Sequence, residues 1–127
     1  MGMFQKHYTR EEARSLLPQI RAWLDGLALL RRRFELLDKE LSSLRESGIE
    51  LGGPKVVQWV KILAEMKQVL NEFHQREIQV KDLDRGLVDF PAIIGGKEVL
   101  LCWEKDEDDV EFWHDIDSGY AGREPIQ

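Results

Sequence analysis

Cysteine is almost missing from this sequence, since Cys102 is the only one among 127 residues. A single cysteine excludes an internal disulfide, and it leaves no Cys-x-x-Cys pair for a zinc ribbon or a redox motif. Long apolar runs are missing too: the longest one in the first helical region, Leu27 to Leu30, is far shorter than the roughly 18 residues of a membrane helix. The N-terminus has neither a secretory h-region nor a myristoylation motif. We therefore expect a cytoplasmic protein that does not enter membranes.

Basic residues are scarce in the C-terminal part. Residues 81–127 carry five basic and thirteen acidic side chains, whereas residues 1–47 carry nine basic and seven acidic ones. The acidic part repels phosphate backbones, and the one basic run, Arg31 to Arg33, can pair with neighbouring acids such as Glu35. The charge pattern argues against nucleic-acid binding.

Helical periodicity is what the first half has in abundance. Thr9 and Glu12 have the spacing of a capping box, and apolar residues then alternate at spacings of three and four over five heptads. They are Ala13, Leu16, Ile20, Trp23, Leu27, Leu30, Phe34, Leu37, Leu41 and Leu44. This pattern predicts a helix from Arg10 to Glu46 that packs along another helix. Pro18 removes an internal hydrogen bond, so we expect a kink or a restart between Arg14 and Pro18.

A second helix follows a turn over residues 47–54, where three glycines precede Pro54. Its predicted seam consists of Val56, Trp59, Leu63, Met66, Leu70 and Phe73, and it should end near Glu77. Residues 9–77 are thus predicted to form a long antiparallel, coiled-coil-like hairpin whose first helix overhangs the second.

Each predicted helix has a second apolar line that the hairpin alone cannot bury. Ala22, Leu29 and Leu36 form it on the first helix, and Ile62 and Val69 on the second. Either the C-terminal part covers these residues or another copy of the chain does. We favour a homodimer through the helices, because it protects Leu29 and Leu36.

A small β-meander is predicted over residues 78–127, with a C-terminal arm. Gly95 and Gly96 make a two-residue hairpin turn, which places Asp89 opposite Cys102. The next turn leaves the register open, so that Cys102 lies opposite either Trp113 or His114. Pro91 lacks an amide hydrogen and predicts an edge strand or a bend. The fold class is therefore α+β in a single domain.

The residues that converge on this sheet allow three interpretations. Asp89, Cys102 and His114 could bind zinc or another divalent ion, or His114 could activate Cys102 as a nucleophile while Asp89 orients the imidazole. Alternatively, Cys102 is a small core residue and His114 an ordinary strand residue. Trp103 and Trp113 could wall a ligand pocket or fill the core.

Arg123 could bind an anion or pair with a nearby acid. No complete catalytic motif is present, so we assign no catalytic residues and do not favour an enzyme.

The C-terminal half resembles a known family through "VKDLDRGLVDFPA", "LLCW" and "WHDIDSGYAGREPI". This is the bacterial family catalogued as domain of unknown function 2203, which usually has glycine where this chain has Glu77 and Asp106. The resemblance implies a common fold and a shared surface around Asp89, Cys102 and His114, and it brings no activity. We thus expect a non-catalytic, self-associating interaction or regulatory module whose acidic face binds a basic partner. The alternative is a small domain that binds a metal or another ligand.

Overall fold

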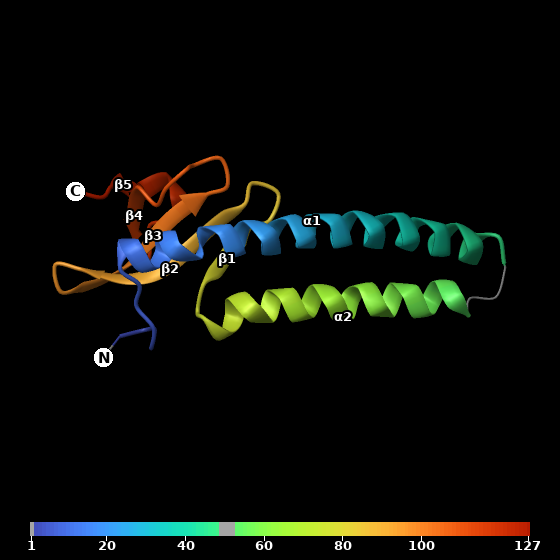
Figure 1. The fold of residues 1–127 in the computed structure, drawn as a ribbon. Helices are drawn as coiled ribbons and strands as arrows, with labels where there is room; N and C mark the ends of the chain where they lie inside the picture. The colour runs from blue at the N-terminus through green and yellow to red at the C-terminus, as the bar shows by residue number, and fades with distance from the viewer. Residues whose placement is uncertain (1, 49–52) are drawn as a thin grey trace.

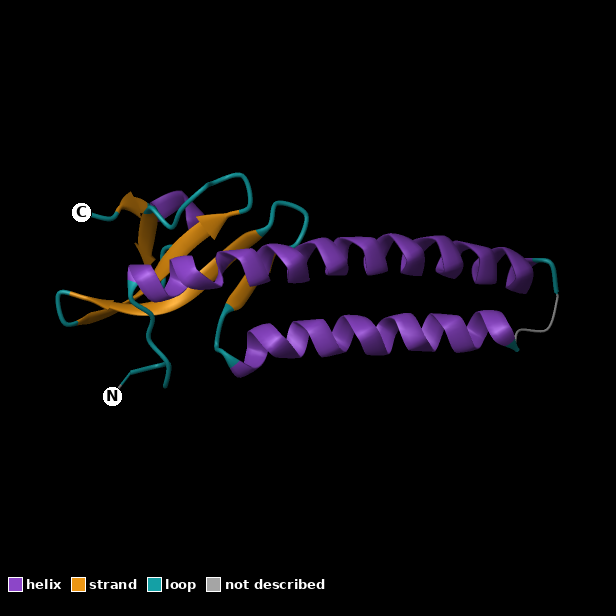
Figure 2. Cartoon of the chain, viewed as in Figure 1, coloured by secondary structure: helices purple, strands orange, loops and turns teal. Residues whose placement is uncertain are grey.

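The fold is a helical hairpin attached at one end to a small antiparallel sheet (Figures 1 and 2). The computed structural model describes residues 2–48 and 53–127, so positions 49–52 of the predicted turn lie outside the described residues. The elements are α1 (Arg10–Glu46), α2 (Pro54–Gln75), β1 (Gln79–Asp82), β2 (Leu87–Ile94), β3 (Lys97–Glu104), β4 (Phe112–Asp115), a short 3-10 helix η1 (Tyr120–Gly122) and β5 (Glu124–Pro125). The predicted α+β class, with a hairpin followed by a meander, is confirmed.

Helix α1 begins at the predicted capping box, in which Thr9 Oγ1 accepts from the Glu12 amide and the Glu12 carboxylate accepts from the Thr9 amide. It runs unbroken to Glu46, so the alternative of a restart near Pro18 is wrong. Pro18 and Arg14 are both exposed, and water can therefore hydrate the Arg14 carbonyl that Pro18 leaves without its helical donor.

The N-terminal part of α1 covers one face of the sheet. Ala13, Leu17, Ile20, Leu24 and Leu27 share one core with residues of β2 and β3, and Trp23 packs edge-on against Phe73 of α2 with ring centroids 5.2 Å apart. The overhang of α1 beyond α2 is thus covered by the chain's own sheet (Figure 1). Leu29 and Leu36 lie outside this cover.

Helix α2 faces α1 along the predicted seam except at two positions. The predicted residues Val56, Trp59, Met66 and Phe73 are buried or half-buried. Ile62 and Val69 are half-buried in place of Leu63 and Leu70, which are 38% and 43% exposed. Ile62 and Leu63 lie three and four residues after Trp59, so the heptad spacing fits either one. Among the 22 residues of α2 only Phe73 is fully buried. Neither helix contains, within the described residues, a stretch long and apolar enough to cross a membrane.

The link from α2 to β1 passes through Glu77, which has a left-handed backbone with φ of 57°. Its carboxylate accepts hydrogen bonds from the amides of Gln5 and Lys6 at 3.0–3.2 Å. The residue thus ends the hairpin and holds the N-terminal segment. A glycine would adopt this backbone without steric cost.

The sheet has the order β1-β2-β3-β4-β5, and all its strands pair antiparallel. The predicted Gly95–Gly96 turn sets the register of β2 and β3, with Asp89 opposite Cys102. Strand β1 pairs with β2 only as far as Asp89, so β2 is an edge beyond that point, as Pro91 requires. There the Pro91 carbonyl accepts from the Tyr8 amide at 2.7 Å.

Candidate functional site

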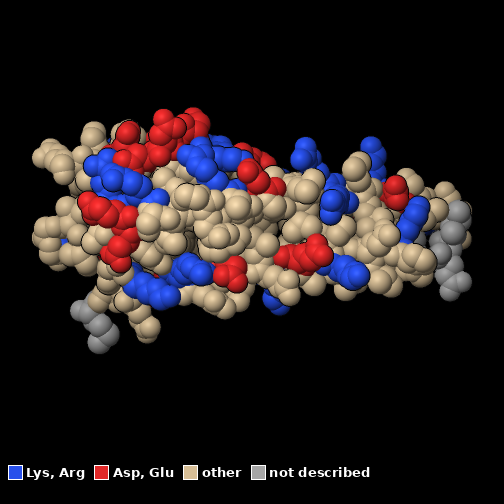
Figure 3. Space-filling view, in the orientation of Figure 1, with Lys and Arg blue, Asp and Glu red and all other residues tan. Residues whose placement is uncertain are grey.

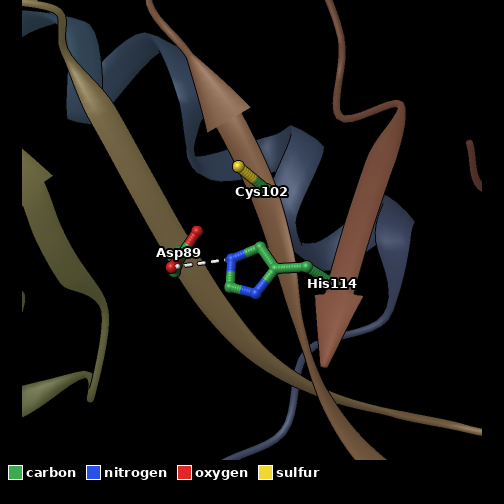
Figure 4. A group of neighbouring side chains, drawn as sticks. All are labelled: Asp89, Cys102 and His114. Carbon is green, nitrogen blue, oxygen red and sulfur yellow. Dashed lines mark hydrogen bonds and ion pairs between the residues drawn. The ribbon is translucent and has the colours of Figure 1, made fainter. Parts of the chain in front are cut away.

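Three titratable side chains from neighbouring strands meet on the face of the sheet that points away from α1. Val88, Phe90 and Ala92 of β2 belong to the core under α1, so the alternation of side chains along the strand turns Asp89 to the other face. Cys102 is the ladder partner of Asp89, and His114 lies on the same face of β4. We call Asp89, Cys102 and His114 the buried cluster (Figure 4).

The geometry of the buried cluster is compact. One candidate ligand atom from each side chain lies within 4.8 Å of the other two, and all three residues are at most 2% exposed. His114 Nε2 and Asp89 Oδ2 are 3.0 Å apart, although β3 separates their strands. Figure 4 shows these two side chains leaning toward each other beside Cys102. Sequence reasoning therefore identified three residues that do converge.

The histidine tautomer follows from its second contact. His114 Nδ1 lies 2.8 Å from the Asp115 carbonyl, which can only accept, so Nδ1 carries a hydrogen. In a neutral ring the lone pair is then on Nε2, which faces the Asp89 carboxylate.

Asp89 is buried in a position where an ionised carboxylate is energetically unfavourable. Burial raises the pKa of Asp89, and His114 and Cys102 beside it offset this rise only in part. Its other oxygen, Oδ1, is buried and has no hydrogen-bond partner among the described residues. A buried carboxylate oxygen without a partner needs a physical explanation.

Cys102 lacks the environment of a nucleophile. Burial, followed by the nearby Asp89 charge, raises the pKa of the Cys102 thiol to about 12. Both imidazole nitrogens of His114 are engaged elsewhere, with Asp89 and with the Asp115 carbonyl. The geometry therefore disfavours the hypothesis of a thiol activated by His114.

The two tryptophans do not line the buried cluster. Trp103 is fully buried in the core under α1, where its Nε1 donates to the Glu107 carbonyl at 2.9 Å and Arg21 stacks on its ring. Trp113 is opposite Leu101 and packs against the same core. Adjacent residues of a strand point to opposite faces, so Trp103 and Cys102 cannot both face one pocket.

Arg123 is held by acids of its own chain. Its Nη2 donates to both Glu107 carboxylate oxygens at 2.8–2.9 Å, and its guanidinium lies over the Phe112 ring. This matches the pairing alternative and leaves little of the side chain for an external anion. No pattern in the sequence singled out Glu107 as this partner.

The register of β3 and β4 differs from both predicted alternatives. Cys102 lies opposite Phe112, Leu101 opposite Trp113, and Leu100 opposite His114. His114 reaches the buried cluster from the next same-face position of β4, because side chains two residues apart share a face.

A helical hairpin with a small meander and a buried cluster of one carboxylate, one thiol and one imidazole defines an α+β domain with a candidate metal centre. A family model described as "Uncharacterized conserved protein (DUF2203)" matches residues 6–126, and the chain belongs to this family. Neither the comparison with curated proteins nor the comparison with solved structures found a match.

Proposed function

We propose that the protein is a non-catalytic interaction module that associates with a second copy of itself through its helical hairpin. The observation that carries this proposal is the exposure of two leucines on one face of α1. Leu29 is 43% and Leu36 68% exposed, in a part of α1 that the sheet does not cover. Leucines of this exposure, seven residues apart on one face, are typical of a helix that packs against another helix.

The charges around Leu36 favour a second copy as the partner. Arg33 and Glu40 of α1, with Lys61 and Glu65 of α2, border the groove that contains Leu36 and the half-buried Ile62. Two bases and two acids make this surface neutral as a whole. Figure 3, which views one side of the molecule, likewise shows charges of both signs along the hairpin with uncharged surface between them.

A two-fold axis fits the order of these residues. Leu29, Arg33, Leu36, Glu40 and Leu44 follow one another at spacings of three and four, and we call them the Leu29–Leu36 face. In an antiparallel two-fold pairing of α1 centred between positions 36 and 37, Arg33 meets Glu40 of the partner subunit. Within one chain the Glu40 carboxylate also contacts Lys55 at 3.3 Å. In the same two-fold pairing Leu29 meets Leu44 of the partner subunit. Such an interface is self-complementary, as a symmetric dimer requires.

A basic partner is less well supported by the charges of the sheet. Several acids of the C-terminal half already form ion pairs with bases of the same chain. Asp109 contacts Arg10 and Arg14, and Glu104 contacts Arg85. These pairs reduce the charge that the acidic half offers to another protein.

Light scattering coupled to size exclusion tests the proposal. The wild type should have the mass of a dimer, and the double variant Leu29→Glu/Leu36→Glu should have that of a monomer, because the interface would then bury four carboxylates. Circular dichroism should show that the variant keeps its helical content, since both positions are exposed.

The matched control is Leu63→Glu/Leu70→Glu, which places the same charges on two leucines of α2 that are 38% and 43% exposed. These leucines lie one position beyond Ile62 and Val69, about 100° further around the helix. The control variant should remain dimeric. A monomeric wild type at high concentration, or dissociation of the control variant alone, would overturn the proposed interface.

A further inference from the structure

We propose that Asp89, Cys102 and His114 form a buried zinc site that fastens three strands of the sheet together. The site goes beyond the proposed function, because it lies in the sheet and not in the hairpin. Thiolate, imidazole and carboxylate are the three protein ligand types that zinc takes. Their donor atoms lie within 4.8 Å of one another, whereas two ligands of a tetrahedral zinc ion are about 3.3–3.8 Å apart. Small side-chain movements therefore suffice to bind the ion.

The contact between His114 and Asp89 favours a bound cation. The Asp115 carbonyl fixes the hydrogen on Nδ1, so a neutral ring directs its Nε2 lone pair at the Asp89 oxygen 3.0 Å away. A lone pair and a carboxylate repel each other unless a cation lies between them. That cation is either a proton or a metal ion. A metal-binding histidine commonly donates its other ring hydrogen to a backbone carbonyl, as His114 does.

The second oxygen of Asp89 is available to a metal ion or to a ligand of that ion. Oδ1 is buried and lacks a hydrogen-bond partner among the described residues. Asp89, Cys102 Sγ and His114 Nε2 supply three vertices of a tetrahedral zinc site, with Oδ1 free to support the ion or to accept from a bound water. A water molecule would complete the four ligands.

The charges of a zinc-filled site balance. One carboxylate, one thiolate, one neutral imidazole and Zn²⁺ sum to zero, so the buried cluster carries no net charge when it holds the ion. Binding releases two protons to solvent, the thiol proton of Cys102 and the proton that Asp89 and His114 share in the metal-free site. Because each ligand comes from a different strand, the ion would cross-link β2, β3 and β4 at one point.

Cobalt binding offers a test that needs no variant. Cys102 is the only cysteine in the chain, so a sulfur-to-cobalt charge-transfer band in the near ultraviolet can arise only from this residue. Metal-free full-length protein titrated with Co²⁺ should develop this band with a break at one equivalent per chain. Zinc should then displace the cobalt and abolish the band. Protein purified without chelator or metal-affinity resin should contain one zinc per chain by elemental analysis.

Variants of Cys102 and His114 test two of the three proposed ligands. Cys102→Ser and His114→Gln should lose stoichiometric metal, whereas His7→Gln, which changes a histidine at the surface, should keep it. Leu100→Ala is the matched control for damage to the sheet, since Leu100 is buried and lies opposite His114 without offering a ligand atom. This variant should melt at a lower temperature and still bind one cobalt with the same band.

The melting temperature supplies an independent readout. Zinc at roughly 1,000 times its Kd should raise the melting temperature of the wild type by about 10 °C, and that of Cys102→Ser by much less. Wild-type protein that shows no cobalt band and no stoichiometric zinc would overturn the proposal, as would metal bound equally by Cys102→Ser. In either case the buried cluster would be a proton-sharing pair beside a core cysteine.

Discussion

The sheet end and the projecting hairpin differ in how each buries its apolar residues. In β2 every residue from Leu87 to Ala92 is buried, both on the face that α1 covers and on the face that carries the buried cluster. In α2 the only fully buried residue is Phe73, next to the sheet. Both regions contain apolar residues at the expected period, but the sheet end buries both faces of β2 whereas the hairpin buries one side of α2.

This difference separates the source of stability from the surface left for binding. The core under α1 joins Trp103, Phe90 and Ile20, which are far apart in the sequence. The distal hairpin has only two helices, and each can bury just the stripe that faces the other. The sheet end should therefore unfold last, while the hairpin supplies the apolar surface that a partner can cover.

The largest expected effect is a loss of stability when a tryptophan is replaced by alanine, and it should differ between the two regions. Trp103→Ala should lower the free energy of unfolding by about 3–5 kcal/mol, because it leaves a cavity in the core and removes the hydrogen bond to the Glu107 carbonyl. Trp59→Ala should cost roughly half as much, since Trp59 is half-buried and stacks mainly on Phe34. Urea unfolding followed by circular dichroism measures both. Equal losses would mean that the hairpin is packed as tightly as the sheet end.

Sequence reasoning predicted the elements that rest on local chemistry. The capping box at Thr9 and the two-glycine turn at Gly95 each involve residues close in the chain, and both are confirmed. The prediction for α2 was wrong at two of its six seam positions, because Ile62 and Leu63 both continue a regular seam from Trp59. Which of them turns toward α1 depends on how the two helices pack, and the spacing of apolar residues does not determine that.

The buried cluster could be predicted only as far as the pairing of residues between neighbouring strands could be predicted. Asp89 lies opposite Cys102 because a two-residue turn determines the pairing. The longer acidic loop before β4 predicted Trp113 or His114 opposite Cys102, and the structure instead pairs Cys102 with Phe112. The position of Trp103 was predictable from strand alternation alone. The hydrogen bond from His114 to the Asp115 carbonyl was not, since a backbone acceptor has no signature in the sequence.

A smaller effect is expected at Glu77, where the two regions join. Glu77→Ala should lower the free energy of unfolding by about 1 kcal/mol, because it keeps the left-handed backbone and loses the hydrogen bonds to Gln5 and Lys6. Glu77→Gly also loses these bonds but relieves the backbone strain, so it should be more stable than Glu77→Ala by about 1 kcal/mol. Thermal unfolding of the two variants, compared with the wild type, gives both differences. Equal stability of the two variants would show that the left-handed backbone stores no strain.

The smallest effect should be confined to the N-terminal segment that lies against the sheet end. Glu98 accepts hydrogen bonds from His7 Nε2 at 2.7 Å and from the Met3 and Phe4 amides at 2.6 and 3.0 Å. The bond from His7, and then those from the two amides, hold the pKa of the Glu98 carboxyl below its usual value of 4.5. A carboxyl whose pKa is lower in the folded state stabilises the fold above its unfolded pKa. That stabilisation is lost as the pH falls from about 4.5 through the lower folded value.

Hydrogen exchange of individual amides measures this local effect. The Met3 and Phe4 amides should lose protection as the pH falls through this range, after correction for the intrinsic pH dependence of exchange, while amides of β2 and β3 keep theirs. In Glu98→Gln the two N-terminal amides should be poorly protected at every pH, because the uncharged amide oxygen is a weaker acceptor than the carboxylate. If acid instead exposed the amides of β2 together with those of Met3 and Phe4, the N-terminal segment would be part of the cooperative core of the sheet end.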